Sequence, residues 1–343
     1  VEDAEDAEVP ELPQPQPESE LPQPEVKLDN WTKMLQRIKK AVKGDENGDK
    51  EVSEDGHADE EEWVVIDTDD AIVTDEANVA RVKRVKAKSR NEVKGKRVRD
   101  EDFEQARQKE LQSFVDTNTY VEVPYEGQHV ISSRWVHTLK LLDDGSTKAK
   151  ARLVARGFED PELGSLLTAS PTCGRGMYRL AVQLCANRGW VPSCIDITTA
   201  FLQGEPLNRD VYLAPPRGYA SDDVVWKLLK GVYGLSDAPR KWYLKVAKTF
   251  RELKSQMVPF DQAFFFWLDD DGVLIGIITV HVDDFYWGGT EEFDKKIMAK
   301  IRKIFPVGKE RRGDFIYCGL MHRTEELGGG KLRITLDQHT YVE

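Results

Sequence analysis

Residues 272–289 read GVLIGIITVHVDDFYWGG, two apolar runs separated by a pair of aspartates. Short apolar runs bounded by glycine predict two buried strands, and the polar interruption between them predicts a tight hairpin turn. Asp283 and Asp284 stand in that turn. Asp-Asp is an ordinary turn dipeptide, and it is equally a pair of carboxylates held on a rigid turn to bind a divalent metal. The stretch alone leaves both interpretations open.

A second carboxylate lies 87 residues upstream, in WVPSCIDITTAF at 190–201, where Asp196 interrupts an apolar strand. From Trp190 onward the expected order is strand, helix, strand, strand, helix, strand. This split βαβ pattern predicts an antiparallel sheet backed by two helices, with the first strand beside the aspartate hairpin. Asp196 would then meet Asp283. Because magnesium prefers carboxylate oxygens, the convergence favours a metal site, with two ions clamping an in-line displacement.

The rest of the body supplies both helices and strands, so the fold class is α+β. The expected elements are a helix over 102–116, a strand hairpin over 131–157 turning at 143–146, helices over 177–190, 236–256 and 291–305, and a strand over 314–323.

Charge divides the chain near residue 80. Residues 1–80 hold 25 acidic and 7 basic side chains, whereas 81–343 hold 36 and 42. We expect 1–97 to be a disordered acidic, proline-rich leader with a transient helix at 30–43, because it lacks the apolar residues of a core. Residues 98–343 would be the folded domain. The four cysteines do not suggest a disulfide framework or a zinc site, and no run reaches the length of a membrane span.

Four ordered blocks carry a family resemblance: RWVHTLKLLDDGSTKAKARLVARGF (134–158), CIDITTAFLQGEPLNRDVYLAPPRGY (194–219), VWKLLKGVYGLSDAPRKWY (225–243) and ITVHVDDFYWGG (278–289). The chain from about Asp102 resembles the reverse transcriptase domain of copia-type long-terminal-repeat retrotransposon Pol polyproteins. The resemblance implies a right-hand polymerase, with fingers at about 120–185, a palm at about 186–310, and the start of the primer grip and thumb at 311–343.

By the same resemblance, Asp196, Asp283 and Asp284 are the catalytic carboxylates and hold two Mg²⁺ ions, for which Mn²⁺ can substitute. The implied activity is RNA-directed DNA polymerisation, with an RNA template, a DNA primer, their hybrid and deoxynucleoside triphosphates as partners. Further Pol segments (integrase, RNase H, protease) would lie outside this fragment of a longer polyprotein. An intracellular, cytoplasmic location with nuclear entry is expected.

Three side chains are implied to contact the nucleotide. Phe201 matches the aromatic gate under the sugar, and its alternative is an ordinary core aromatic. Lys140 and Arg152 are the candidates for gripping the triphosphate, since a lysine and a fork-shaped arginine both suit phosphate. The same hairpin and its flanks carry other basic residues that could do so, namely Arg134, Lys148, Lys150 and Arg156.

The chain departs from the family at two positions. His281 stands where an aromatic tyrosine is usual, and Asp237 stands where a glutamine beside the nucleotide is common. Asp237 either caps the helix that begins at Ala238, which we favour, or weakens the site with negative charge. Residues 317–320 resemble the primer-gripping strand, or form an ordinary core strand.

The basic tract at 81–98 suits phosphate contact, a solvated linker or a nuclear-import signal. Two rival functions remain. One is a catalytically inactive nucleic-acid-binding relic, which Asp237 favours mildly and the intact carboxylates do not. The other is a different two-metal nucleotidyltransferase on the same sheet.

Overall fold

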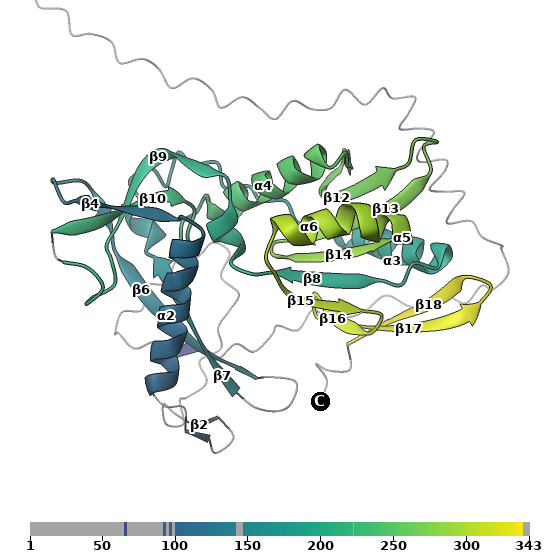
Figure 1. The fold of residues 1–343 in the computed structure, drawn as a ribbon, viewed down its shortest axis with the longest axis horizontal. Helices are drawn as coiled ribbons and strands as arrows, with labels where there is room; N and C mark the ends of the chain where they lie inside the picture. The colour runs from purple at the N-terminus through teal and green to yellow at the C-terminus, as the bar shows by residue number, and fades with distance from the viewer. Residues whose placement is uncertain are drawn as a thin grey trace, which may run out of the picture. The chain divides into compact units, whose positions relative to one another are not determined.

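The computed structural model describes residues 100–141, 147–221 and 223–338, together with two-residue strands at 65–66, 92–93 and 96–97. All of these residues belong to one unit of the chain, 49–343. The elements are shown in Figure 1.

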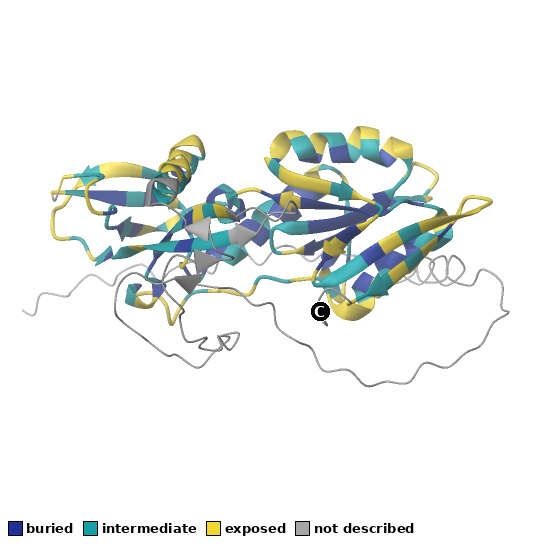
Figure 2. Cartoon of the chain, turned by 90° about the horizontal axis from the view of Figure 1, so that it is seen from below, coloured by how far each residue is buried: buried dark blue, intermediate teal, exposed yellow. Residues whose placement is uncertain are grey.

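A six-stranded antiparallel sheet carries the aspartate hairpin. Its order is β11-β12-β13-β14-β8-β15. The strands are β8 (Ser193–Ile197), β11 (Gln256–Val258), β12 (Asp261–Leu268), β13 (Leu274–His281), β14 (Asp284–Gly289) and β15 (Val307–Arg312). Buried residues concentrate in this sheet (Figure 2) because its apolar strands are covered on both faces.

Four helical segments bury one face of this sheet. They are α4 (Ala238–Glu252), α5 (Glu291–Phe293), the π-helical turn η3 (Asp294–Met298) and α6 (Ala299–Ile304). Their apolar residues form one core with alternate side chains of the strands, including Ile195, Ile197, Phe285 and Trp287. The helix α3 (Arg175–Arg188) lies on the other face, where Cys185 fills the space over Gly288.

The preceding part of the chain builds a second core around Phe114, Leu153 and Trp226. It contains the helix α2 (Asp100–Asp116), a sheet of order β4-β10-β9-β5 and the hairpin β6–β7, which pairs with β1. The bounds are β1 (Val65–Ile66), β2 (Glu92–Val93), β3 (Lys96–Arg97), β4 (Tyr120–Pro124), β5 (Val130–Ile131), β6 (Ser133–Leu141), β7 (Thr147–Ala155), η1 (Gly157–Glu159), η2 (Ala200–Gln203), β9 (Pro206–Leu213) and β10 (Val224–Lys230).

The last described residues form a separate sheet of β16 (Phe315–Tyr317), β17 (Leu320–Gly328) and β18 (Lys331–Asp337). The prediction of one strand over 314–323 is therefore wrong. Cys318 and Gly319 have φ of 46° and 77°, and two consecutive positive values make a tight hairpin turn that reverses the chain. The strand β15, not 314–323, completes the six-stranded sheet next to β8.

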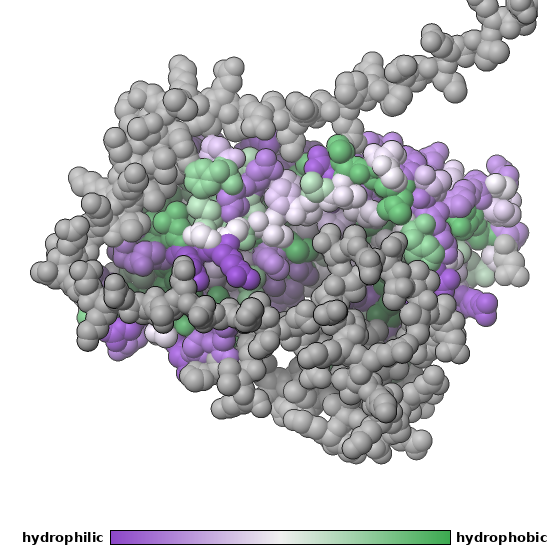
Figure 3. All heavy atoms as spheres, turned by 180° about the vertical axis from the view of Figure 1, so that it is seen from behind, coloured by the Kyte–Doolittle hydropathy of each residue, from purple (hydrophilic) through white to green (hydrophobic). Residues whose placement is uncertain are grey.

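The helices expected over 102–116, 177–190 and 236–256 are confirmed to within a few residues, and so is the β6–β7 hairpin. The helix expected over 291–305 is interrupted by the π-helical turn. The hairpin turn at 143–146, the helix at 30–43 and most of the acidic leader lie outside the described residues. Within the described part of the chain, no helix is long and apolar enough to cross a membrane. On the coloured part of the face in Figure 3, hydrophilic and hydrophobic residues are interspersed.

Candidate active site

The middle of the six-stranded sheet brings two carboxylates together. Asp284 of β14 is the antiparallel partner of Asp196 in β8. Because side chains alternate along a strand, burial of Ile195 and Ile197 in the α4 core places Asp196 on the opposite face, where it is exposed. Asp284 precedes the buried Phe285 and shares that face. The expected meeting of the two strands is present.

The turn between β13 and β14 consists of Val282 and Asp283, since His281 pairs with Asp284. The expected Asp-Asp turn is thus displaced by one residue, and Asp284 is the first residue of a strand. The Asp283 carbonyl accepts a hydrogen bond from the Ile197 backbone N–H at 2.9 Å. This bond fixes the turn beside the strand that carries Asp196.

The Asp283 carboxyl lies in a mixed electrostatic field. Burial raises its pKa above the ordinary value, and the nearby Asp196 carboxylate raises it further. Its own backbone N–H and the positive charges of Arg152 and Lys150 lower it in part. Both basic residues belong to β7, so the hairpin β6–β7 places its positive charge within electrostatic reach of the carboxylates.

These donors fit a divalent cation of the magnesium type. They are hard carboxylate oxygens, and a bound cation would offset the repulsion from Asp196 that adds to burial in raising the pKa of Asp283. Across the described residues, no three His, Cys, Asp or Glu side chains form a group that could hold a metal ion, and this includes the expected set of Asp196, Asp283 and Asp284. An ion held by one or two of these aspartates would complete its shell with water or phosphate oxygens, as magnesium commonly does.

Of the two residues expected to grip the triphosphate, Arg152 can be placed. Its guanidinium carbon lies 5.3 Å from the centre of the Tyr233 ring. Burial raises the pKa of Tyr233 to about 12, which keeps its hydroxyl protonated beside the arginine. Lys140 contributes its backbone to β6, opposite Lys148, but its side chain lies outside the described part of the structure.

The expected sugar gate, Phe201, is half-buried and packs between the two cores. Its ring makes a T-shaped contact with Tyr233, with ring centres 5.2 Å apart at 64°. Tyr233 therefore connects Phe201 to Arg152. Sequence reasoning missed Tyr233. The only signal was an aromatic residue between Gly231 and Gly234 in the third family block.

The capping role favoured for Asp237 is wrong. Asp237 does stand at the N-cap position, directly before α4, but its carboxylate makes no capping hydrogen bond to that helix. It is buried and accepts from Arg209, with Nε–Oδ2 at 3.2 Å. Arg209 also donates to both oxygens of Asp160, at 2.7 and 3.0 Å. The cation draws the carboxylate away from the helix, and its positive charge, shared with Asp160, offsets part of the negative charge of Asp237.

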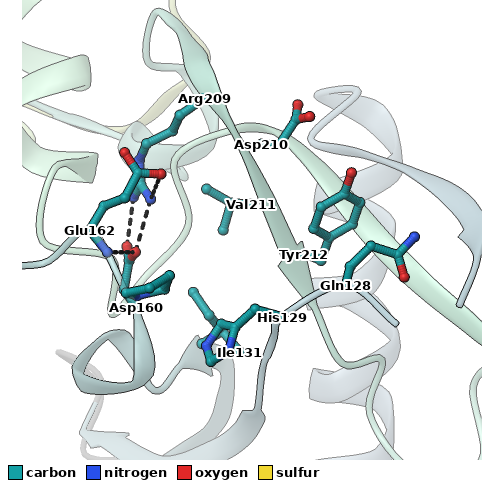
Figure 4. Close-up of a pocket in the computed structure, with 10 residues that line it drawn as sticks. Gln128, His129, Ile131, Asp160, Glu162, Arg209, Asp210, Val211 and Tyr212 are labelled. Atoms are coloured by element: carbon teal, nitrogen blue, oxygen red, sulfur yellow. Dashed lines mark hydrogen bonds and ion pairs between the residues drawn. The ribbon is translucent and has the colours of Figure 1, made fainter. Parts of the chain in front are cut away.

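A hollow of about 290 Å³ lies beside this ion-pair network (Figure 4). It is lined by Gln128, His129, Ile131, Asp160, Pro161, Glu162, Arg209, Asp210, Val211 and Tyr212. The dashed lines in Figure 4 include the ion pairs of Arg209 with Asp160 and Glu162.

The segment compared with a primer grip, 317–320, is a hairpin turn with Tyr317 at its start. The Tyr317 hydroxyl lies 3.5 Å from the Asp284 carbonyl oxygen, so the C-terminal sheet touches the carboxylate strand. His281 is exposed beside the turn. The basic tract at 81–98 lies outside the described residues, apart from the backbones of β2 and β3.

Residues 115–307 match the family described as reverse transcriptase (RNA-dependent DNA polymerase). The chain is 36% identical over 156 residues to the retrovirus-related Pol polyprotein from transposon RE1 of Arabidopsis thaliana, covering 43% of this chain and 11% of that protein. It is 32% identical over 206 residues to the corresponding polyprotein from transposon TNT 1-94 of Nicotiana tabacum, covering 57% and 15%. The chain thus spans a small part of the length of these relatives.

Among solved structures, a foamy viral protease-reverse transcriptase in complex with double-stranded DNA aligns with a TM-score of 0.39 and 15% identity. The alignment covers 65% of this chain and 34% of that one.

Proposed function

This chain belongs to the reverse transcriptase (RNA-dependent DNA polymerase) family, as the reverse transcriptase domain of a copia-type Pol polyprotein, and we propose on that premise that it copies RNA into DNA. The observation that carries the proposal is the juxtaposition of Asp196 with Asp284, next to the turn that presents Asp283. A sheet gains no stability from carboxylates placed opposite each other. They serve a cationic ligand.

The proposed reaction joins a primer to a deoxynucleoside triphosphate on an RNA template. The primer 3′-oxygen forms a bond to the α-phosphorus and its proton passes to solvent water, while the bond from that phosphorus to the bridging oxygen breaks and pyrophosphate leaves. Asp196, Asp283 and Asp284 would hold Mg²⁺ or Mn²⁺. Such ions, when bound, supply charge stabilisation of the phosphate oxygens and a lower pKa of the primer hydroxyl.

The chain's own residues would orient the nucleotide. Arg152, together with Lys150 or Lys140, would meet the triphosphate, because charge-assisted bonds from arginine suit phosphate oxygens. Phe201, in T-shaped contact with Tyr233, would lie under the sugar and exclude a 2′-hydroxyl. In this assignment β6–β7 belongs to the fingers and the six-stranded sheet is the palm, with 98–343 as the domain and 1–97 as a leader.

A primer-extension assay on poly(rA)–oligo(dT) with Mg²⁺ tests the proposal, with Asp196→Asn as the matched inactive variant. Extension by the wild type but not by the variant supports polymerase activity. Binding of the hybrid without extension would instead support the inactive relic. The pairing of Asp237 with Arg209 offsets part of the negative charge that favoured the relic.

A further inference from the structure

The turn that presents Asp283 is built on an unfavourable backbone conformation. Val282 has a φ of 56°, in the left-handed region that β-branched residues rarely adopt. A two-residue hairpin turn with positive φ at its first central position normally has glycine there. Such a conformation persists only where the surrounding structure holds it, so a contact with the rest of the protein must hold Val282.

That contact comes from the helix α4, 40 residues away in sequence. The indole Nε1–H of Trp242 donates to the Val282 carbonyl oxygen at 2.7 Å. Trp242 is 1% exposed, so no water replaces this carbonyl if the turn moves away. A buried indole N–H without an acceptor is unfavourable, and the bond therefore opposes any change in the Val282 peptide.

The Trp242 ring is itself fixed. It lies nearly parallel to Phe285, at 8° with centres 6.4 Å apart, and edge-on to Phe305 at 5.2 Å. Trp242 thus contacts Val282 on one side of the two aspartates and Phe285 on the other. Movement of the Asp283–Asp284 backbone would break the hydrogen bond or disturb the ring packing.

We propose that Trp242 is a positioning residue for the candidate metal site. It holds Val282 in its left-handed conformation and so sets the direction of Asp283 and Asp284 before any ligand binds. This inference rests on the proposed function of those aspartates. Trp242 lies in the core beneath the turn and acts only through it.

A second tryptophan provides a matched control. Trp267 lies in the same core, is 2% exposed, and donates its Nε1–H to the Leu253 carbonyl at 2.9 Å, at the end of α4. Trp242→Phe and Trp267→Phe each remove one buried indole N–H and leave an aromatic ring. Only the first removes a bond to the turn.

The test titrates each whole-chain variant with Mn²⁺ alone and follows the bound ion by electron paramagnetic resonance, alongside thermal melting. We expect comparable losses of melting temperature, at least tenfold weaker Mn²⁺ binding for Trp242→Phe, and at most a twofold change for Trp267→Phe. Faster amide exchange across residues 280–286 should accompany the first variant only. Equal Mn²⁺ affinity and equal exchange in the two variants would overturn the inference.

If Trp242→Phe folds poorly, Val282→Gly provides a second background for the test. Glycine adopts the positive φ of residue 282 without steric cost, so the turn no longer needs the Trp242 bond for its stability. The protein that carries both Val282→Gly and Trp242→Phe should be stable. Compared with Val282→Gly alone, it should bind Mn²⁺ several-fold more weakly and exchange its backbone amides faster over residues 280–286. Identical binding and exchange by these two proteins would overturn the role of Trp242. Absence of Mn²⁺ binding by the wild type would overturn the proposed metal site itself, and amide exchange would then decide whether Trp242 holds the turn.

Discussion

Asp284 lies directly opposite Asp196 across the β14–β8 pair, on the face of the sheet away from the α4 core, where Asp196 is exposed and Asp284 is half-buried. Opposed residues in an antiparallel pair have Cβ atoms about 4.5–5.5 Å apart, and like charges at that separation are destabilising. The sheet would be more stable without this pair. We therefore attribute its position to the proposed metal site and not to folding.

Asp283→Asn tests how much the ionised Asp283 carboxylate destabilises the folded protein. The raised pKa of Asp283 means that the folded protein holds this proton more tightly than the unfolded chain does. Stability from this group is complete below the ordinary aspartate pKa and is lost as pH rises through the raised value. At pH 7, Asp283→Asn should melt at a higher temperature than the metal-free wild type.

The same variant should lose Mn²⁺ binding, and its primer extension should fall by several orders of magnitude, because it removes metal-binding charge without creating a cavity. Asp270→Asn removes a charge from an exposed loop and should change neither property. Retention of more than a tenth of wild-type extension by Asp283→Asn would contradict the assignment.

The sequence was sufficient for features set by local pattern. Apolar periodicity predicted α4 and β13, and the isolated Asp196 predicted a strand beside the hairpin. Contacts between distant residues were not predictable from such patterns. The ion pair of Asp237 with Arg209 joins residues 28 apart, and the turn at Cys318–Gly319 interrupts what reads as one strand. Gly319 was a signal for that turn, but Cys318 at positive φ was not.

Phe201→Val separates the sugar gate from a core aromatic. If the ring lies under the sugar, the variant should incorporate ribonucleotides at least tenfold more often relative to deoxynucleotides, with a modest stability loss because Phe201 is only half-buried. Phe250→Val is the matched control, since Phe250 is fully buried in the α4 core. It should lose roughly 3 kcal/mol and leave the ratio unchanged. An unchanged ratio in Phe201→Val would remove Phe201 from the site.

The buried network of Arg209 should be structural. The side chains of Arg209, Asp160 and Asp237 are 8%, 1% and 4% exposed. Arg209→Met leaves two buried carboxylates without a counterion and should cost roughly 3–5 kcal/mol in urea unfolding. Arg323→Met breaks an ion pair with Asp337 in which the arginine is 57% exposed, and should cost less than about 1 kcal/mol. Similar costs for the two variants would contradict this account.

His322 should make the stability of the protein fall as the pH drops through the mildly acidic range. It is fully buried against the Tyr178 hydroxyl, and burial lowers its pKa to about 4. The unfolded chain takes up this proton near pH 6.5 and the folded chain only near pH 4, so stability falls as pH drops through that window. The loss amounts to roughly 3 kcal/mol. His322→Gln should flatten this part of the pH profile, whereas His281→Gln, at an exposed site, should not.

Gly308 tests the placement of Asp196 without altering a carboxylate. A Cβ at Gly308 would lie 2.7 Å from Oδ2 of Asp196 and 2.8 Å from Oγ1 of Thr198, both too close for van der Waals contact. The φ of Gly308 is outside the left-handed region, so alanine there acts by contact and not by backbone strain.

We expect Gly308→Ala to displace the Asp196 carboxylate and reduce primer extension about 100-fold, the scale of a misplacement of about 1 Å in a catalytic group. Its melting temperature should change little, because Gly308 is exposed at an irregular point of β15. Gly176→Ala, where a Cβ meets open space in α3, is the control and should extend primers normally. Normal extension by Gly308→Ala would show that the reaction does not depend on where the Asp196 carboxylate lies, and would remove Asp196 from the site.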